Sequence, residues 1–163
     1  MPHEAIAASP SREKPGLHMG SLEAELVLGE GAERRASRAI DILVLREDAE
    51  SGQALADSLT ELLPAGSRTS ATRNGFEALI EIGERRPDVL VTDLGVAGLD
   101  FFRMVHFLRD HARDSLMVVV LVASEADRAG VRERLPDDVA VIGAPTENAS
   151  LAARVWALLK DGP

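Results

Sequence analysis

The chain has 163 residues, a formal net charge of −9 and no cysteine. This length suits one domain of about 100 to 150 residues with an extension, and the lack of cysteine excludes disulfides and thiolate metal sites. There is no apolar run of the roughly 20 residues that a membrane span needs and no secretory signal, and the acidic balance disfavours a direct nucleic-acid surface. We therefore expect a cytoplasmic globular protein without membrane or nucleic-acid contacts.

Residues 1–38 differ in composition from the rest of the chain. Proline and glycine recur in the first 20 residues, and a short apolar patch at residues 22–28 is followed by Gly29 and charged residues. This composition predicts a flexible N-terminal extension. The alternative is that Leu22, Leu26 and Val27 dock on the domain or on a partner, and the sequence leaves both interpretations open.

From residue 39 onward, apolar strands and amphipathic helices alternate. The predicted strands are 40–45, 68–72, 89–92, 116–122 and 139–142, and the predicted helices are 51–63, 76–85, 101–109, 127–135 and 149–159. The segment 116–122 is the most apolar, as expected of a central parallel strand covered on both faces. The alternation predicts an α/β fold over residues 39–160, with a doubly wound five-stranded parallel sheet in a three-layer sandwich.

Helical spacing indicates which side chains share a face of each helix. The recurring apolar sets are Leu55, Leu59, Leu62 and Leu63 in the first helix, Phe76, Leu79, Ile80 and Gly83 in the second, Phe101, Met104, Val105 and Leu108 in the third, and Leu151, Val155, Leu158 and Leu159 in the last. Phe102 and Trp156 fall outside these sets, so we consider both as candidate contact residues. His106 and His111 are interpreted as surface or packed histidines, because no paired metal spacing lies near them.

Asp93 directly follows the third predicted strand and precedes a loop that contains Gly95 and Gly98. Open α/β sheets bind their ligands beyond the carboxyl ends of the strands. Asp93 is therefore the leading candidate for a functional residue.

Four motifs resemble those of the receiver domain of bacterial two-component response regulators. They are ILVLRED at 42–48, NGFEAL at 74–79, PDVLVTDLGVAGLD at 87–100 and AP at 144–145. The resemblance covers roughly residues 39–160 and implies a flavodoxin-like (CheY-like) fold. It also implies that Asp93 occupies the position that accepts a phosphoryl group from a histidine kinase in working members.

The metal-binding positions of the family are altered in this chain. Working receivers hold Mg²⁺ with two acidic residues after the first strand and the acceptor aspartate, and these positions read Arg46, Glu47 and Asp93. Because Arg46 brings a positive charge, we expect no metal or other cofactor, with Glu47 and Asp93 as vestigial ligands. A guanidinium can bind a carboxylate through two charge-assisted hydrogen bonds, so we predict that Arg46 pairs with Asp93 in place of the metal. Glu47 is otherwise interpreted as a charge at a helix N-terminus.

The positions that bind and sense the phosphoryl group are also altered. The resemblance places the hydroxyl residue at Val122, the lysine at Ala144 and the switch aromatic at Val141, and none of these side chains can perform that role. Ser124 could replace the missing hydroxyl only if its loop rearranged.

These substitutions predict a pseudo-receiver that is not an enzyme and signals through protein contacts, without phosphorylation. By family analogy, its surface is the last helix with its neighbours, residues 127–135 and 149–160, and its partner is another signalling protein or a second copy. Two alternatives remain. One is a genuine phosphoacceptor, phosphorylated on Asp93 by a histidine kinase through an atypical, metal-poor route, which is the one case in which Mg²⁺ is expected. The other is a sensor of a small anion near Arg46.

Overall fold

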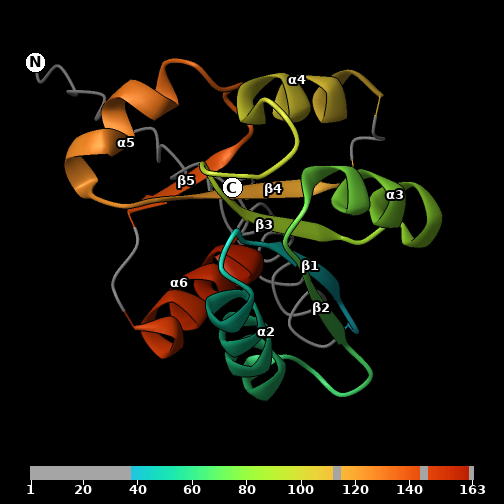
Figure 1. Ribbon diagram of the computed structural model, residues 1–163. Helices are drawn as coiled ribbons and strands as arrows, with labels where there is room; N and C mark the ends of the chain where they lie inside the picture. The colour runs from blue at the N-terminus through green and yellow to red at the C-terminus, as the bar shows by residue number, and fades with distance from the viewer. Residues whose placement is uncertain (1–37, 112–114, 144–146, 162–163) are drawn as a thin grey trace, which may run out of the picture.

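The computed structural model describes residues 38–111, 115–143 and 147–161 of the chain. Five parallel strands form one sheet in the order β2-β1-β3-β4-β5 (Figure 1). The strands are β1 (Asp41–Leu45), β2 (Arg68–Thr72), β3 (Val89–Asp93), β4 (Met117–Val122) and β5 (Ala140–Gly143). The helices are α2 (Ala49–Leu62), α3 (Gly75–Arg85), α4 (Phe101–His111), α5 (Glu125–Arg132) and α6 (Asn148–Asp161). The predicted doubly wound five-stranded fold is confirmed.

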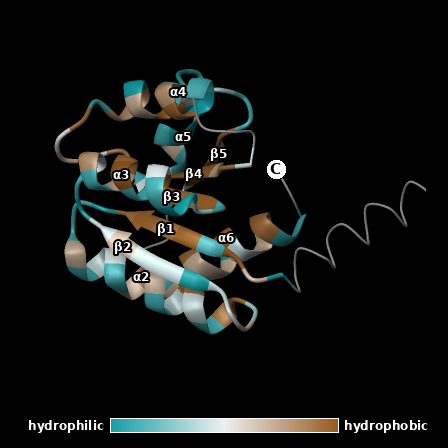
Figure 2. Cartoon of the chain, turned by 90° about the vertical axis from the view of Figure 1, so that its right-hand side faces the viewer, coloured by the Kyte–Doolittle hydropathy of each residue, from teal (hydrophilic) through white to brown (hydrophobic). Residues whose placement is uncertain are grey.

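Helices cover both faces of the sheet. Figure 1 shows α3, α4 and α5 on one face and α2 and α6 on the other. Because successive side chains of a strand point to opposite faces, Leu43 and Leu45 pack under the first group of helices while Ile42 and Val44 pack under the second. β1 is accordingly hydrophobic over most of its length, whereas the edge strand β2 is paler in Figure 2. The central strands are thus held by two separate cores.

Polar caps determine where three helices begin. Asp48 accepts a hydrogen bond from the backbone N of Ser51, Asn74 from that of Phe76, and Ser124 from that of Asp127. Each cap satisfies an N–H group that has no partner within its helix. As a result, α5 begins at Glu125 rather than at the predicted residue 127.

Two members of the second predicted apolar set, Phe76 and Ile80, face outward and not into the core. Phe76 is 55% exposed and Ile80 is 59% exposed, while Ala78 is buried against the sheet and Leu79 is half-buried. Small residues form the inner face because the helix is close to its surroundings: a Cβ at Gly75 would lie 3.1 Å from Leu99 Cδ1. In α2 the inner face consists of Leu55, Ala56 and Leu59, and the predicted member Leu62 is 40% exposed.

Within the described ranges, we find no helix with the length and apolar character that crossing a membrane requires.

Candidate functional site

The candidate site lies where the strand order reverses. β1 pairs with β2 on one side and with β3 on the other, so the connections after β1 and β3 leave the sheet at neighbouring positions. Asp93 is the last residue of β3, and Arg46 directly follows β1. The fold therefore brings together two charged residues that are 47 positions apart, at the place where doubly wound sheets bind ligands.

Arg46 and Asp93 form an ion pair. The Nε of Arg46 donates to Asp93 Oδ2 at 2.9 Å, and the two side chains are only 18% and 27% exposed. Arg46 Nη1 donates to Oδ1 of Asn148, the first residue of α6, at 3.3 Å. The predicted pairing is present, with one bond to the carboxylate rather than two. Because Nη1 bonds Asn148, the guanidinium connects the ends of β1 and β3 to the start of α6.

The two acidic residues that follow Arg46 point in different directions. Glu47 is exposed, and its Oε2 lies 3.3 Å from the position that a Cβ would occupy on Gly95, in the loop after Asp93. Asp48 instead faces α2 and accepts from the Ser51 backbone N at 3.0 Å. Hydrogen bonds from the Ser51 side chain and backbone lower the pKa of Asp48 below its ordinary value. Asp48, not Glu47, therefore caps the helix.

The residues at this site do not fit a Mg²⁺ ion. Mg²⁺ takes oxygen ligands in near-octahedral geometry and in proteins is bound mainly through carboxylates. Asp93 already bonds a guanidinium, and Asp48 is engaged at the helix end. The Glu47 carboxylate lies against Gly95, in the loop that follows Asp93. Over the parts of the chain that the structure describes, no three His, Cys, Asp or Glu side chains gather as a metal site would require.

The positions that would bind and sense a phosphoryl group are apolar. Val122 is 1% exposed and Val141 is 7% exposed, and both belong to the core under α3, α4 and α5. The hydroxyl of Ser124 donates to Asp127 Oδ2 at 2.7 Å and accepts from the Asp127 backbone N, so it serves as a cap. Ala144 lies outside the described residues.

The two candidate contact residues are less open than the sequence suggests. Phe102 is half-buried, and the guanidinium carbon of Arg134 lies 3.6 Å from its ring centroid. Trp156 is half-buried against the core beside α2 and α6, with Lys160 Nζ 5.7 Å from its ring centroid. Phe102 is therefore covered on one face by Arg134. The role of both residues in binding stays a prediction.

The two histidines of α4 are exposed, in line with their interpretation as surface residues. The Nε2 of His106 lies 3.2 Å from the backbone oxygen of Arg134, and Nδ1 of His111 lies 3.0 Å from that of Phe107. The His111 ring also stacks on Phe107 with 4.3 Å between the ring centroids.

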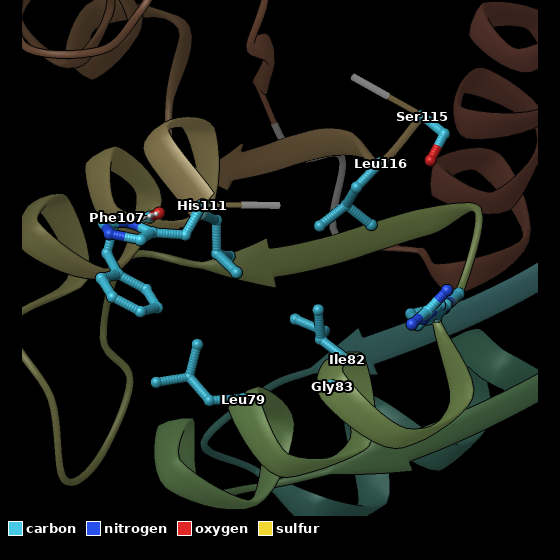
Figure 3. Close-up of a pocket in the computed structure, with 10 residues that line it drawn as sticks. Leu79, Ile82, Gly83, Phe107, His111, Ser115 and Leu116 are labelled. Carbon is cyan, nitrogen blue, oxygen red and sulfur yellow. Dashed lines mark hydrogen bonds between the residues drawn. The ribbon is translucent and has the colours of Figure 1, made fainter. Parts of the chain in front are cut away.

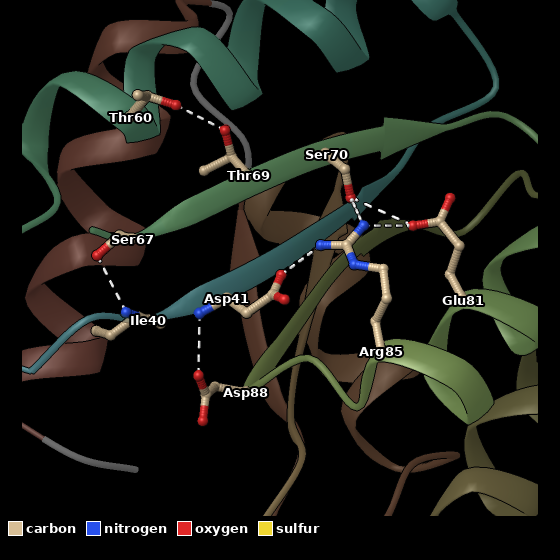
Figure 4. A network of polar contacts seen from close by, with 9 residues as sticks. All are labelled: Ile40, Asp41, Thr60, Ser67, Thr69, Ser70, Glu81, Arg85 and Asp88. Atoms are coloured by element: carbon tan, nitrogen blue, oxygen red, sulfur yellow. Dashed lines mark hydrogen bonds and ion pairs between the residues drawn. The ribbon is translucent and has the colours of Figure 1, made fainter. Parts of the chain in front are cut away.

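A second polar cluster lies at the opposite edge of the sheet, and we did not predict it from the sequence (Figure 4). Arg85 donates to Ser70 Oγ at 2.7 Å, to Glu81 Oε2 at 2.8 Å and to Asp41 Oδ1 at 2.5 Å. The spacing of Glu81 and Arg85 by four residues was the only signal of this cluster in the sequence.

The chain was compared with known proteins. No family model matches it. The transcriptional regulatory protein AfsQ1 of Streptomyces coelicolor is 31% identical over 123 residues, which are 74% of this chain. The chain spans about half the length of that curated relative, 52%.

Solved structures with this fold include two receivers. The receiver domain of the Francisella response regulator 1452 is 25% identical, with a TM-score of 0.59 over 74% of this chain and 97% of that chain. The chemotaxis response regulator CheY4 of Vibrio cholerae is 15% identical, with a TM-score of 0.62 over 75% of this chain and 99% of that chain. The latter likeness concerns the fold alone.

Proposed function

Since the chain carries a receiver domain of the response-regulator (CheY-like) type, we propose that it acts as a pseudo-receiver, a non-enzymatic module that signals through protein contacts without phosphorylation. The observation that carries this proposal is the ion pair between Arg46 and Asp93, at 2.9 Å. In this pair the acceptor carboxylate is bonded to a cation that belongs to the protein. A phosphoryl donor would have to displace Arg46 before Asp93 could attack.

Charge considerations support the same proposal. Phosphoryl transfer depends on cations that neutralise the developing charge on the phosphoryl oxygens, and a receiver obtains one of them from its bound metal. Here the site offers the guanidinium of Arg46, whose Nε and Nη1 already donate to Asp93 and Asn148. The buried Val122 adds no polar group. Little is left to stabilise a phosphorylated Asp93.

The proposed contact surface consists of residues 127–135, which include most of α5, and residues 149–160 of α6. Residues 125–130 of α5 are all exposed, and Val131 is the buried residue of this helix. The exposed residues mix the small Ala126, Ala129 and Gly130 with charged ones. Such a surface has room for the close approach of a partner helix and charges that select it. The partner is another signalling protein or a second copy of this chain.

The experiment is phosphorylation by acetyl phosphate with Mg²⁺, followed by intact mass measurement. The proposal predicts no phosphoryl adduct on the full chain at times when an active receiver is modified. An adduct that disappears in Asp93→Asn would contradict it and favour the phosphoacceptor alternative.

A matched variant tests whether Arg46 prevents Mg²⁺ binding. Arg46→Asp removes the internal cation and places a carboxylate beside Glu47 and Asp93, which restores a set of ligands that suits Mg²⁺. We expect this variant to bind Mg²⁺ more tightly than the natural chain in an NMR titration. Equal affinities would show that Arg46 is not what keeps the ion away.

A further inference from the structure

A groove between α3 and α4 has no role in the proposed function. It has a volume of about 290 Å³, and its lining residues are Leu79, Ile82, Gly83, Arg86 and Pro87 from α3 and the segment after it, Phe107, Leu108 and His111 from α4, and Ser115 and Leu116 before β4. Figure 3 shows Leu79 and Ile82 on one side and Phe107 with His111 on the other. The groove is lined mainly by apolar side chains, which indicates an apolar ligand.

The groove continues an exposed apolar stretch of α3. Phe76 and Ile80 are 55% and 59% exposed on this helix, and Phe107 of α4 is 50% exposed. The space over Gly83 is open, since a Cβ at this position would meet no atom within 4 Å. Contiguous exposed apolar areas are typical of binding surfaces.

The start of the described chain lies at one end of this groove. Arg38 forms an ion pair with Asp88, the residue that follows the groove residue Pro87. The nine residues 29–37 connect Arg38 to the apolar patch at residues 22–28. A connection of nine residues reaches at most about 30 Å, and a short flexible tether gives an effective concentration of roughly millimolar. Even weak binding within the same chain would then fill the groove.

The charges of residues 21–30 and of the groove are complementary. Residues 21–30 contain Glu23, Glu25 and Glu30 and no lysine or arginine. The two ionisable side chains that line the groove, Arg86 and His111, are both of the basic type. Leu22 and Leu26 are four residues apart, the spacing at which two side chains share a helix face. Recognition of apolar anchors at this spacing is a common way to fill a groove between helices.

We propose that residues 22–28 of this chain dock in the groove between α3 and α4 and cover its apolar surface. Leu22 and Leu26 insert between Leu79, Ile82 and Phe107, and the neighbouring glutamates face Arg86 and His111. This inference does not depend on the state of Asp93.

Paramagnetic relaxation tests the proposal in the full chain. Because the chain has no cysteine, Ser21→Cys provides a single attachment point for a nitroxide label next to the segment. We expect the methyl signals of Leu79, Ile82 and Leu116 to lose intensity, and those of Leu55 and Leu151 beside α2 and α6 to keep it. Equal intensities in the two sets would overturn the proposal.

Two glycine variants provide matched controls. Gly83→Glu fills the groove and adds a negative charge, while Gly130→Glu makes the same change on α5, and at both positions a Cβ meets no atom within 4 Å. The signal loss should disappear with Gly83→Glu and with Leu22→Asn/Leu26→Asn, and should persist with Gly130→Glu. Persistence in Gly83→Glu would contradict docking in this groove. The unchanged signals of Leu55 and Leu151 would verify that each variant is folded.

A mixed sample distinguishes the chain's own segment from that of a second copy. Spin-labelled chain without isotopes is combined with isotope-labelled chain without a spin label, so that only contacts between molecules cause relaxation. The proposal predicts no loss at Leu79 and Ile82 in this sample. A loss there equal to that of the single chain would overturn intramolecular docking in favour of a dimer.

Discussion

Two arginine-centred clusters stabilise opposite edges of the same sheet, and they differ in the number of groups that each arginine satisfies. At the edge where the strands begin, Arg85 donates to two carboxylates and a hydroxyl, those of Asp41, Glu81 and Ser70. At the edge where the strands end, Arg46 donates to the carboxylate of Asp93 and the amide oxygen of Asn148. Both arginine side chains are largely buried, at 24% exposure for Arg85 and 18% for Arg46.

The comparison shows that the carboxylate of Asp93 is balanced in the same way as that of Asp41. In both clusters a carboxylate at a strand end is balanced by an arginine from a neighbouring element, and hydrogen bonds satisfy part of the remaining guanidinium. The site around Asp93 therefore follows the same physical pattern as the cluster around Arg85. It has fewer bonds, so its loss should cost less stability.

The largest expected effect is that of Arg85→Met. This change leaves Asp41 and Glu81, which are 20% and 30% exposed, without their cation. We expect a loss of about 2 to 3 kcal/mol in the free energy of unfolding, below the full cost of an uncompensated buried charge because water reaches both groups. Urea unfolding followed by Trp156 fluorescence measures it. Arg128→Met, which breaks an exposed pair with Glu125, is the control and should stay within about 0.5 kcal/mol.

Asp93→Asn should destabilise the protein by about 1 kcal/mol, because it replaces a charge-assisted hydrogen bond to Arg46 with a neutral one. The sign of the effect is informative. In a site built of several carboxylates, the same change removes repulsion between like charges and stabilises the fold. A midpoint of urea unfolding that rises in Asp93→Asn would therefore contradict the pairing with Arg46.

Arg86→Gly is expected to stabilise the protein. Arg86 is the C-cap of α3 and has a φ of 53°. This left-handed conformation costs a residue with a Cβ roughly 1 kcal/mol, whereas glycine adopts it at very little cost. The same change removes one of the two basic side chains of the groove, so docking of residues 22–28 should weaken while stability rises. If stability rises and docking does not weaken, Arg86 has no role in docking. Thermal unfolding and the relaxation experiment report the two separately.

The smallest effect concerns the exposed cap Asp48, and it depends on pH. Hydrogen bonds from Ser51 lower the pKa of Asp48 in the folded protein, so the charged cap contributes stability above its unfolded pKa of about 3.9. This contribution disappears as the pH falls through the lowered folded value. Asp48→Ala should therefore be less stable than the natural chain at pH 7, and the difference should shrink on acidification. A difference that grows toward low pH would contradict the assignment.

The sequence predicted the fold well where apolar spacing and burial coincide. In α4 the predicted set Phe101, Met104, Val105 and Leu108 is the buried set. The prediction failed in part for α3. Gly75 packs closely against Leu99 of the loop after β3 and Ala78 against the core, which leaves the larger Phe76 and Ile80 outside. Hydrophobicity alone cannot reveal that a helix has too little space for its own large residues.

The candidate site was predictable in part. The pairing of Arg46 with Asp93 follows from opposite charges at the ends of adjacent strands, and the contact is present. The bond from Arg46 to Asn148 joins residues 102 positions apart, and no local pattern indicates it. The groove between α3 and α4 depends in the same way on how two helices lie side by side, so only the structure could reveal it.

The most direct test of the central claim is an amide NMR titration of the full chain with Mg²⁺ and then with beryllofluoride, which mimics a phosphoryl group. If Arg46 occupies the place of the metal, the amide signals of Glu47, Asp93 and Val122 should not shift in either step. Saturable shifts of these signals would contradict the account and identify Asp93 as a working phosphoacceptor.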